Sequence, residues 1–148
     1  MSLYPGQLAH AAGFAENIYL DPATRTRVEE TGGANLIFIT HDNVFVTPKS
    51  STILPSVTRR SLMTVARDYL GMKVEEREVL FSEVPNFAEC GLCGTAAVIS
   101  PIGWLNYKGT DVQVADGKVG PVAQKLYNTL YGMQTGTVAD DMGWTVKL

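Results

Sequence analysis

The sequence predicts a single α+β domain. The chain has 148 residues, of which 45% are hydrophobic and 18% are charged, which is the composition of one ordinary globular domain. Two segments, 56–70 and 121–133, carry apolar residues at helical spacing. Short apolar runs bounded by turn residues lie before, between and after them, as is typical of strands. Helical and β segments alternate irregularly, and no repeat, low-complexity segment or linker divides the chain.

The first part of the chain is predicted to contain mainly β structure. Residues 7–13 form a short helical piece that ends at a glycine, and residues 17–20 form a short strand before an Asp-Pro turn. The run 35–39, NLIFI, predicts a fully buried strand. Residues 44–46 follow it across a three-residue turn at 41–43, which predicts a β-hairpin.

The rest of the chain is predicted to contain the two main helices. The helix over 56–70 follows a proline and stops at a glycine, and the helix over 121–133 starts with a proline, which is favoured in a first turn. Between them, residues 73–80 and 97–102 read as strands, and 107–117 as a hairpin with Lys-Gly and Asp-Gly turns.

The composition argues against several classes of protein. A net charge of -3 with 12 scattered Lys and Arg residues does not favour a nucleic-acid binder. Two Cys and two His are too few for a structural zinc site unless all four join it, so we expect no metal. No apolar run approaches the roughly 20 residues that span a bilayer, and no signal sequence opens the chain. We therefore expect a cytoplasmic protein without a membrane partner.

A Ser/Thr-rich turn precedes the first long helix, in the segment 47–60, TPKSSTILPSVTRR. The first amides of that helix, near Val57 and Thr58, lack intrahelical partners and favour an anion such as phosphate. The alternative is that Ser56 or Thr58 merely caps the helix. A second segment, CGTAA at 93–97, could bind an anion, because it offers small residues, a hydroxyl and consecutive amides. The alternative is an ordinary glycine turn before a strand.

Two adjacent carboxylates, Glu29 and Glu30, stand before a Gly-Gly turn. If this segment is extended, they point to opposite faces, so that one of them is turned toward the interior or a cleft. A carboxylate there would need a cation or a protonated ring nitrogen as its partner. The alternative is a pair of solvated turn residues.

Cys90 and Cys93 form a CxxC motif. Such a motif is redox-active when it opens a helix within a βαβ pattern, and neither feature surrounds it here. A structural or incidental pair, a redox switch and a metal site remain as alternatives.

Five ordered blocks of the sequence resemble one protein family. VEETGGANLIFI, TPKSSTILPSVTRRSL, GMKVEEREV, CGTAAVISPI and GPVAQKLYNTLYGMQTG are similar to the C-terminal part of the branched-chain amino acid aminotransferases, which are class IV pyridoxal-phosphate enzymes. The resemblance implies the cofactor-binding C-terminal domain of the D-amino-acid aminotransferase-like fold, with a mixed sheet or pseudo-barrel flanked by helices.

The resemblance also implies roles for particular residues. Glu30 would pair with the pyridine nitrogen of pyridoxal 5'-phosphate, and Val57, Thr58 and Thr95 would hold its phosphate. The amides of Ala96 and Ala97 would receive the substrate carboxylate. Ser56 stands where the family usually has glycine.

Two features of the family are missing from the sequence. The block that carries the Schiff-base lysine does not appear, and neither does the N-terminal half that supplies a phosphate-binding arginine. We therefore expect residues 1–148 to be a C-terminal portion without the N-terminal domain, containing no catalytic lysine and inactive alone.

The expected activity of the full-length enzyme is transfer of the amino group of Leu, Ile or Val to 2-oxoglutarate, by a homo-oligomer. Alternatives within the fold are a D-amino-acid aminotransferase and an aminodeoxychorismate lyase. Outside it, they are a thiol redox protein and a non-catalytic binding module.

Overall fold

Helices and strands follow one another irregularly in the computed structural model, which describes residues 3–146. In chain order they are α1 (Leu3–Ala11), β1 (Ile18–Leu20), β2 (Val28–Thr31), β3 (Asn35–Ile39), β4 (Phe45–Pro48), α2 (Val57–Thr64), η1 (Val65–Tyr69), β5 (Val74–Arg77), η2 (Phe81–Asn86), β6 (Glu89–Gly94), β7 (Val98–Pro101), β8 (Trp104–Tyr107), β9 (Thr110–Gln113) and α3 (Pro121–Thr135). The element η1 continues α2 as one π-helical stretch, and η2 is a 3-10 helix.

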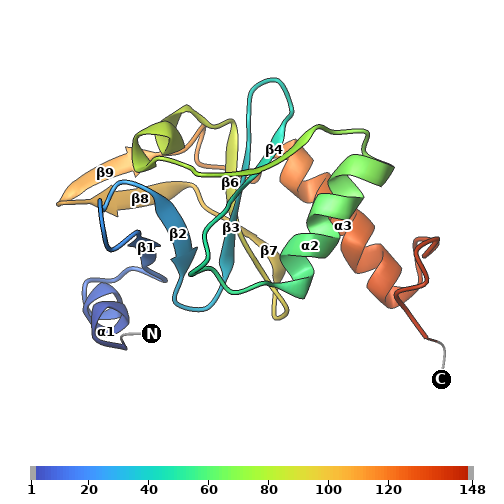
Figure 1. Cartoon of the computed structure of the whole chain (residues 1–148), viewed down its shortest axis with the longest axis horizontal. Helices are drawn as coiled ribbons and strands as arrows, with labels where there is room; N and C mark the ends of the chain where they lie inside the picture. Colours follow the sequence, from blue (N-terminus) through green and yellow to red (C-terminus); the bar gives the residue numbers. More distant parts are fainter. Residues whose placement is uncertain (1–2, 147–148) are drawn as a thin grey trace.

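A five-stranded mixed sheet forms the centre of the molecule (Figure 1). Its strands lie in the order β5-β4-β3-β6-β7, with β4 and β5 parallel and all other neighbours antiparallel. The parallel pair is possible because α2 and η1 carry the chain back from the end of β4 to the start of β5. This mixed sheet with helices is the α+β fold that the sequence predicts.

The central sheet is covered on both faces. Its middle strand, β3, is therefore buried on both sides. All five of its residues are buried, and the four apolar ones, at 36–39, alternate between two apolar clusters. Ile37 and Ile39 join the cluster formed with α2, η1 and α3. Leu36 and Phe38 join the cluster formed with β1, β2, η2 and β8. Figure 1 shows α2 and α3 on one side of the sheet and the two small sheets, β1-β2 and β8-β9, on the other.

Several local predictions are confirmed. The β3-β4 hairpin turns where expected, with Asn43 at φ 60°, and the β8-β9 hairpin turns at Lys108 and Gly109, both at positive φ. Helix α3 begins at Pro121, as predicted, and ends before Gly136 at φ 76°. Among residues 3–146, no helix is long and apolar enough to cross a membrane.

Other elements differ from the prediction. The first helix is Leu3–Ala11 rather than 7–13, and none of its residues is buried. The strand predicted over 97–102 begins at Val98, because residues 95–97 form a turn. The sequence pattern predicts no strand over Glu89–Gly94, which is β6. This segment has little strand character of its own and is extended because it pairs with every residue of β3.

Helix α3 is capped by a side chain that comes from far along the chain. The buried carboxylate of Glu89, on β6, accepts hydrogen bonds from the amides of Val122 at 2.9 Å and Ala123 at 2.7 Å. These amides are in the first turn of α3, where the helix itself offers them no acceptor. Gly120 is required beside them, because a Cβ there would overlap the Glu89 carboxylate. One side chain therefore fixes α3 against the sheet.

We expect Glu89→Ala to lower the free energy of unfolding by about 2–3 kcal/mol, because it leaves two first-turn amides without an acceptor and removes a charge-assisted contact. Glu78→Ala is the control, since its side chain is 63% exposed and it should cost less than about 1 kcal/mol. Urea unfolding of both variants measures the difference. Equal stabilities would show that Glu89 does not hold α3.

Candidate functional site

Three loops meet at one end of the central sheet. The antiparallel pairing of β3 with β4 and β6 places the start of β3 beside the ends of its two neighbours. The β2-β3 turn, the loop from β4 to α2 and the β6-β7 turn therefore lie together, at the lower end of the sheet in Figure 1. The topology gathers segments that are far apart in the sequence.

A cavity of about 770 Å³ opens between these loops. We call it the sheet-end cavity, and it is lined by residues 30–35, 51–57 and 93–95. Three of the residues that the sequence singled out, Glu30, Val57 and Thr95, therefore line one cavity.

The two adjacent carboxylates do point to opposite faces of β2. Glu30 lines the sheet-end cavity, and its Oε2 accepts hydrogen bonds from Asn35 Nδ2 at 2.9 Å and from the amide of Leu54 at 3.1 Å. Glu29 lies on the other side, where its Oε1 accepts from the hydroxyls of Ser50 at 3.0 Å and Thr52 at 2.6 Å. Both carboxylates hold the loop before α2, but only Glu30 is presented to the cavity.

The N-terminus of α2 forms another part of the cavity wall. Ser56 caps the helix, as the simpler interpretation predicts, by accepting a hydrogen bond from the amide of Arg59 at 3.2 Å. This cap satisfies one first-turn donor and leaves the amides of Val57 and Thr58 without an intrahelical acceptor. Capping and anion binding are therefore compatible at this helix.

The side chain of Arg59 fixes this helix end in place. It is 9% exposed, and its Nη1 donates to the carbonyl of Pro48 at 2.9 Å and lies 3.0 Å from Glu76 Oε1. The first turn of α2 is thereby tied to β4 and β5. The sequence pattern does not single out Arg59, since a charged residue in a first turn is normally exposed.

The β6-β7 turn supplies the third part of the site. Thr95, Ala96 and Ala97 are exposed, and Val98 follows at φ 57°, a conformation that β-branched residues rarely adopt. Thr95 lines the sheet-end cavity, and its hydroxyl bonds to no other residue that the structure describes.

Three of the predicted site residues do not line the cavity. Thr58, the second residue of α2, is buried and is not part of the cavity wall, so only its amide remains as a contact to propose. Ala96 and Ala97 lie next to the lining residue Thr95 but not in the wall itself. Asn35 also lines the cavity and was not predicted; its only signal in the sequence is that it is a polar residue at the start of an apolar strand. The loop 51–55, from the Ser/Thr-rich segment 47–60, lines the cavity as well.

The two cysteines lie on opposite faces of β6. They are three residues apart on a strand, which places Cys90 in the cluster with Leu36 and Phe38 and Cys93 in the cluster with Ile37 and Ile39. Burial raises the pKa of both thiols, that of Cys93 to about 12. Because the two thiols are buried in different clusters, the structure supports a packing role for them rather than a redox pair.

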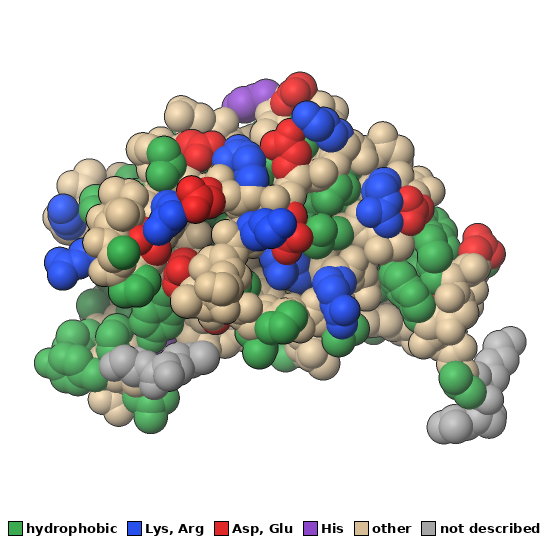
Figure 2. All heavy atoms as spheres, in the orientation of Figure 1, with side chains coloured by type: hydrophobic (Ala, Val, Ile, Leu, Met, Phe, Trp, Pro, Cys, Tyr) green, Lys and Arg blue, Asp and Glu red, His purple; other side chains and the backbone are tan. Residues whose placement is uncertain are grey.

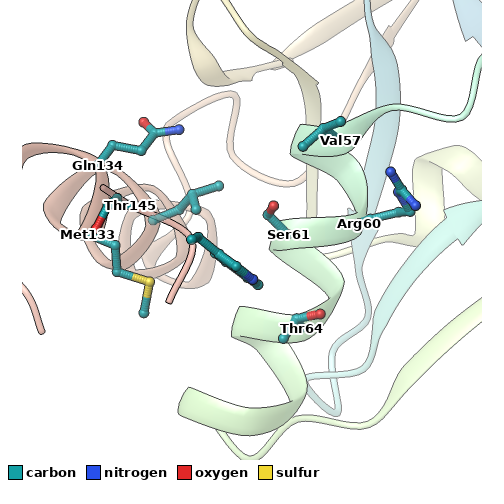
Figure 3. Close-up of a pocket in the computed structure, with 9 residues that line it drawn as sticks. Val57, Arg60, Ser61, Thr64, Met133, Gln134 and Thr145 are labelled. Atoms are coloured by element: carbon teal, nitrogen blue, oxygen red, sulfur yellow. The ribbon is translucent and has the colours of Figure 1, made fainter. Parts of the chain in front are cut away.

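A second hollow, which we call the helix groove, measures about 470 Å³ and lies between α2 and α3. It is lined by Val57, Arg60, Ser61, Thr64, Leu130, Met133, Gln134, Trp144 and Thr145. In Figure 3, Val57 and Ser61 stand on the side of α2 that faces Met133 and Gln134, whereas Arg60 projects to the other side. No carboxylate lines the groove among the described residues, so it lacks the combination of groups found in the sheet-end cavity.

The sheet-end cavity thus combines one carboxylate with the free amides of a helix end and a threonine hydroxyl. A helix N-terminus attracts an anion, and a carboxylate attracts a cation or a protonated nitrogen. The arrangement suits a small molecule that carries both kinds of group.

Comparisons with known proteins agree on one family. The family model described as amino-transferase class IV matches residues 2–103. The branched-chain-amino-acid aminotransferase of Haemophilus influenzae is 46% identical over 153 residues, covering 99% of this chain and 45% of that protein. The enzyme of the same name from Helicobacter pylori is 43% identical over 147 residues, covering 99% of this chain and 43% of that protein.

Solved structures give the same result. The branched-chain amino acid aminotransferase of Escherichia coli matches with a TM-score of 0.83 and 31% identity, over 96% of this chain and 45% of that one. The enzyme of the same name from Thermobaculum terrenum, in its PLP form, matches with a TM-score of 0.78 and 30% identity, over 90% of this chain and 41% of that one. The chain therefore spans less than half the length of these relatives.

We expect both thiols to be unreactive toward a thiol reagent such as 5,5'-dithiobis(2-nitrobenzoate) in the native chain, because they are buried and their pKa values are raised. Both should react once the chain is unfolded in denaturant. A native chain that forms a Cys90–Cys93 disulfide under mild oxidation would contradict the placement of the thiols on opposite faces.

Proposed function

The chain belongs to the class IV aminotransferases, and on this premise we propose that it holds pyridoxal 5'-phosphate in the sheet-end cavity for transamination of branched-chain amino acids. The observation that carries the proposal is that Glu30 and Val57, the first residue of α2, line the same cavity, so that a carboxylate and a helix N-terminus meet there. These two features match the two charged ends of the cofactor, its ring nitrogen and its phosphate.

The residues present fit this group. A cavity of about 770 Å³ is within the range of small-ligand sites, which is about 300–1,000 Å³. Both hydrogen bonds to Glu30 go to Oε2, so Oε1 accepts none from the described residues. That oxygen can accept a hydrogen bond from a protonated pyridine nitrogen. The Val57 and Thr58 amides and the Thr95 hydroxyl are donors suited to a phosphate.

The roles of the chain's residues follow from these contacts. Glu30 keeps the ring nitrogen protonated, and Val57, Thr58 and Thr95 bind the phosphate and so fix the ring's position. The amides of Ala96 and Ala97, which follow Thr95 in an exposed turn, receive the substrate carboxylate. When bound, the cofactor supplies an electron sink for negative charge at the substrate Cα.

The amino donors are Leu, Ile and Val and the acceptor is 2-oxoglutarate. The names of the most similar relatives support this choice over a D-amino-acid aminotransferase or an aminodeoxychorismate lyase. We further propose that residues outside this sequence complete the site, including the lysine that reacts with the cofactor. A cytoplasmic location remains a prediction from the sequence.

Val57→Pro tests the phosphate contact. Proline is favoured at the first helical position, and Ser56 before it is already extended at ψ 133°, so the substitution deletes one amide hydrogen without disturbing α2. We expect binding of pyridoxamine 5'-phosphate to weaken about tenfold by calorimetry, the effect of one hydrogen bond to a charged group. Val57→Ala, which alters a side chain that is 69% exposed, is the control. Equal affinities of the two variants would refute the contact.

The 148-residue chain alone should not catalyse transamination. No lysine lines the sheet-end cavity in the part of the chain that the structure describes, so the covalent step has no nucleophile. An assay of amino transfer from leucine to 2-oxoglutarate, with added cofactor, measures this activity. Turnover comparable to that of a complete branched-chain aminotransferase would overturn the proposal that further residues complete the site.

We also propose that the chain self-associates. Leu3, Tyr4 and Leu8 on α1 are 77%, 65% and 52% exposed, and Figure 2 shows hydrophobic side chains gathered over this part of the molecule. Exposed apolar patches of this kind drive association. Sedimentation over a concentration series should show a rising mass, which Leu3→Ser with Leu8→Ser should abolish. A wild-type chain that is monomeric at all concentrations would contradict this proposal.

A further inference from the structure

Asn35 is a polar residue at a position where the fold favours an apolar one. It opens β3, is 3% exposed and precedes four buried apolar residues. Its partner across the sheet is the buried Cys93. It also lines the sheet-end cavity, at the end of β3 where the three loops meet.

The side-chain amide of Asn35 is committed to Glu30. Its Nδ2 donates to Glu30 Oε2 at 2.9 Å. An ionised carboxylate only accepts hydrogen bonds, so the amide group must turn its nitrogen toward Glu30 and its oxygen away. The Leu54 amide donates to the same Oε2 at 3.1 Å. Two donors on one oxygen fix the carboxylate and leave Oε1 open.

This orientation has a cost for the fold. Asn35 Oδ1 is buried and has no hydrogen-bond partner among the described residues. A buried acceptor without a partner is destabilising, and an apolar residue of similar size would avoid the penalty. The stability of β3 therefore does not account for an asparagine here, whereas the contact with Glu30 does.

We infer that Asn35 is a positioning residue, which holds Glu30 by Oε2 so that Oε1 faces the ring nitrogen of the bound cofactor. The inference rests on the proposed function, in which Glu30 pairs with that nitrogen. Asn35 acts through Glu30, to which its side-chain amide is bonded.

Asn35→Leu separates this role from a structural one. It removes the donor to Glu30 and also the unpartnered oxygen, at similar volume. We expect the thermal midpoint of the free chain to be unchanged or raised, and binding of pyridoxamine 5'-phosphate to weaken about tenfold. Ultraviolet absorption of the bound ligand against pH should show the ring-nitrogen pKa lowered by about one unit, since a displaced carboxylate favours the protonated ring less.

Two further variants make the test decisive. Thr47→Val deletes a different side-chain hydrogen bond on the sheet, a buried one from Thr47 Oγ1 to the Leu36 carbonyl at 2.8 Å, outside the cavity wall. It should lower the thermal midpoint and leave binding unchanged. Asn35→Ala, which adds no bulk, replaces Asn35→Leu if the leucine variant does not fold, and it should show the same loss of binding and the same pKa shift.

The outcomes distinguish this inference from the proposed function. Glu30→Gln should weaken binding and lower the ring-nitrogen pKa more than Asn35→Leu does. If Glu30→Gln has these effects and the Asn35 variants bind and titrate like the wild type, the positioning role is wrong and the proposed function stands. If Glu30→Gln behaves like the wild type, or the wild type does not bind the ligand, both are wrong. An Asn35→Leu chain that changes only in thermal midpoint also overturns the inference.

Discussion

The pairing of β3 with β6 is the interaction on which the rest of the structure depends. Every residue of β3 has a partner on β6, from Asn35 opposite Cys93 to Ile39 opposite Glu89. Because β3 is buried on both faces, this pairing holds two apolar clusters together rather than one. β4 and β7 pair with the two outer sides of this strand pair, and the two flanking layers pack on its two faces.

The same register places the groups at both ends of β6. At its start, Glu89 reaches the first turn of α3 and caps it, which fixes the helix on one face of the sheet. At its end, Gly94 leads into Thr95, beside the β2-β3 turn that follows Glu30. A shift of one residue would exchange the faces of every side chain on β6, so both the helix cap and the cavity depend on this register.

The sheet-end cavity also explains why polar side chains occur at positions that the core would fill with apolar ones. Arg59 and Asn35 are both buried, and each leaves a polar atom without a partner among the described residues. Arg59 ties the first turn of α2 to β4 and β5, and Asn35 orients Glu30. The fold accepts these costs at the end of the sheet where the loops converge, while the centre of each cluster remains apolar.

The sequence by itself determined the features that depend on neighbouring residues. Helical spacing and Pro121 predicted α3, the apolar run predicted β3, and period-two geometry required Glu29 and Glu30 to diverge. Only the tertiary structure decided that Glu89–Gly94 is a strand, that its two cysteines face different clusters, and that Glu89 caps a helix 33 residues away. The physical reason is that these outcomes depend on pairing between distant segments. No local pattern records which strand β6 will meet, and that meeting fixes where each of its side chains points.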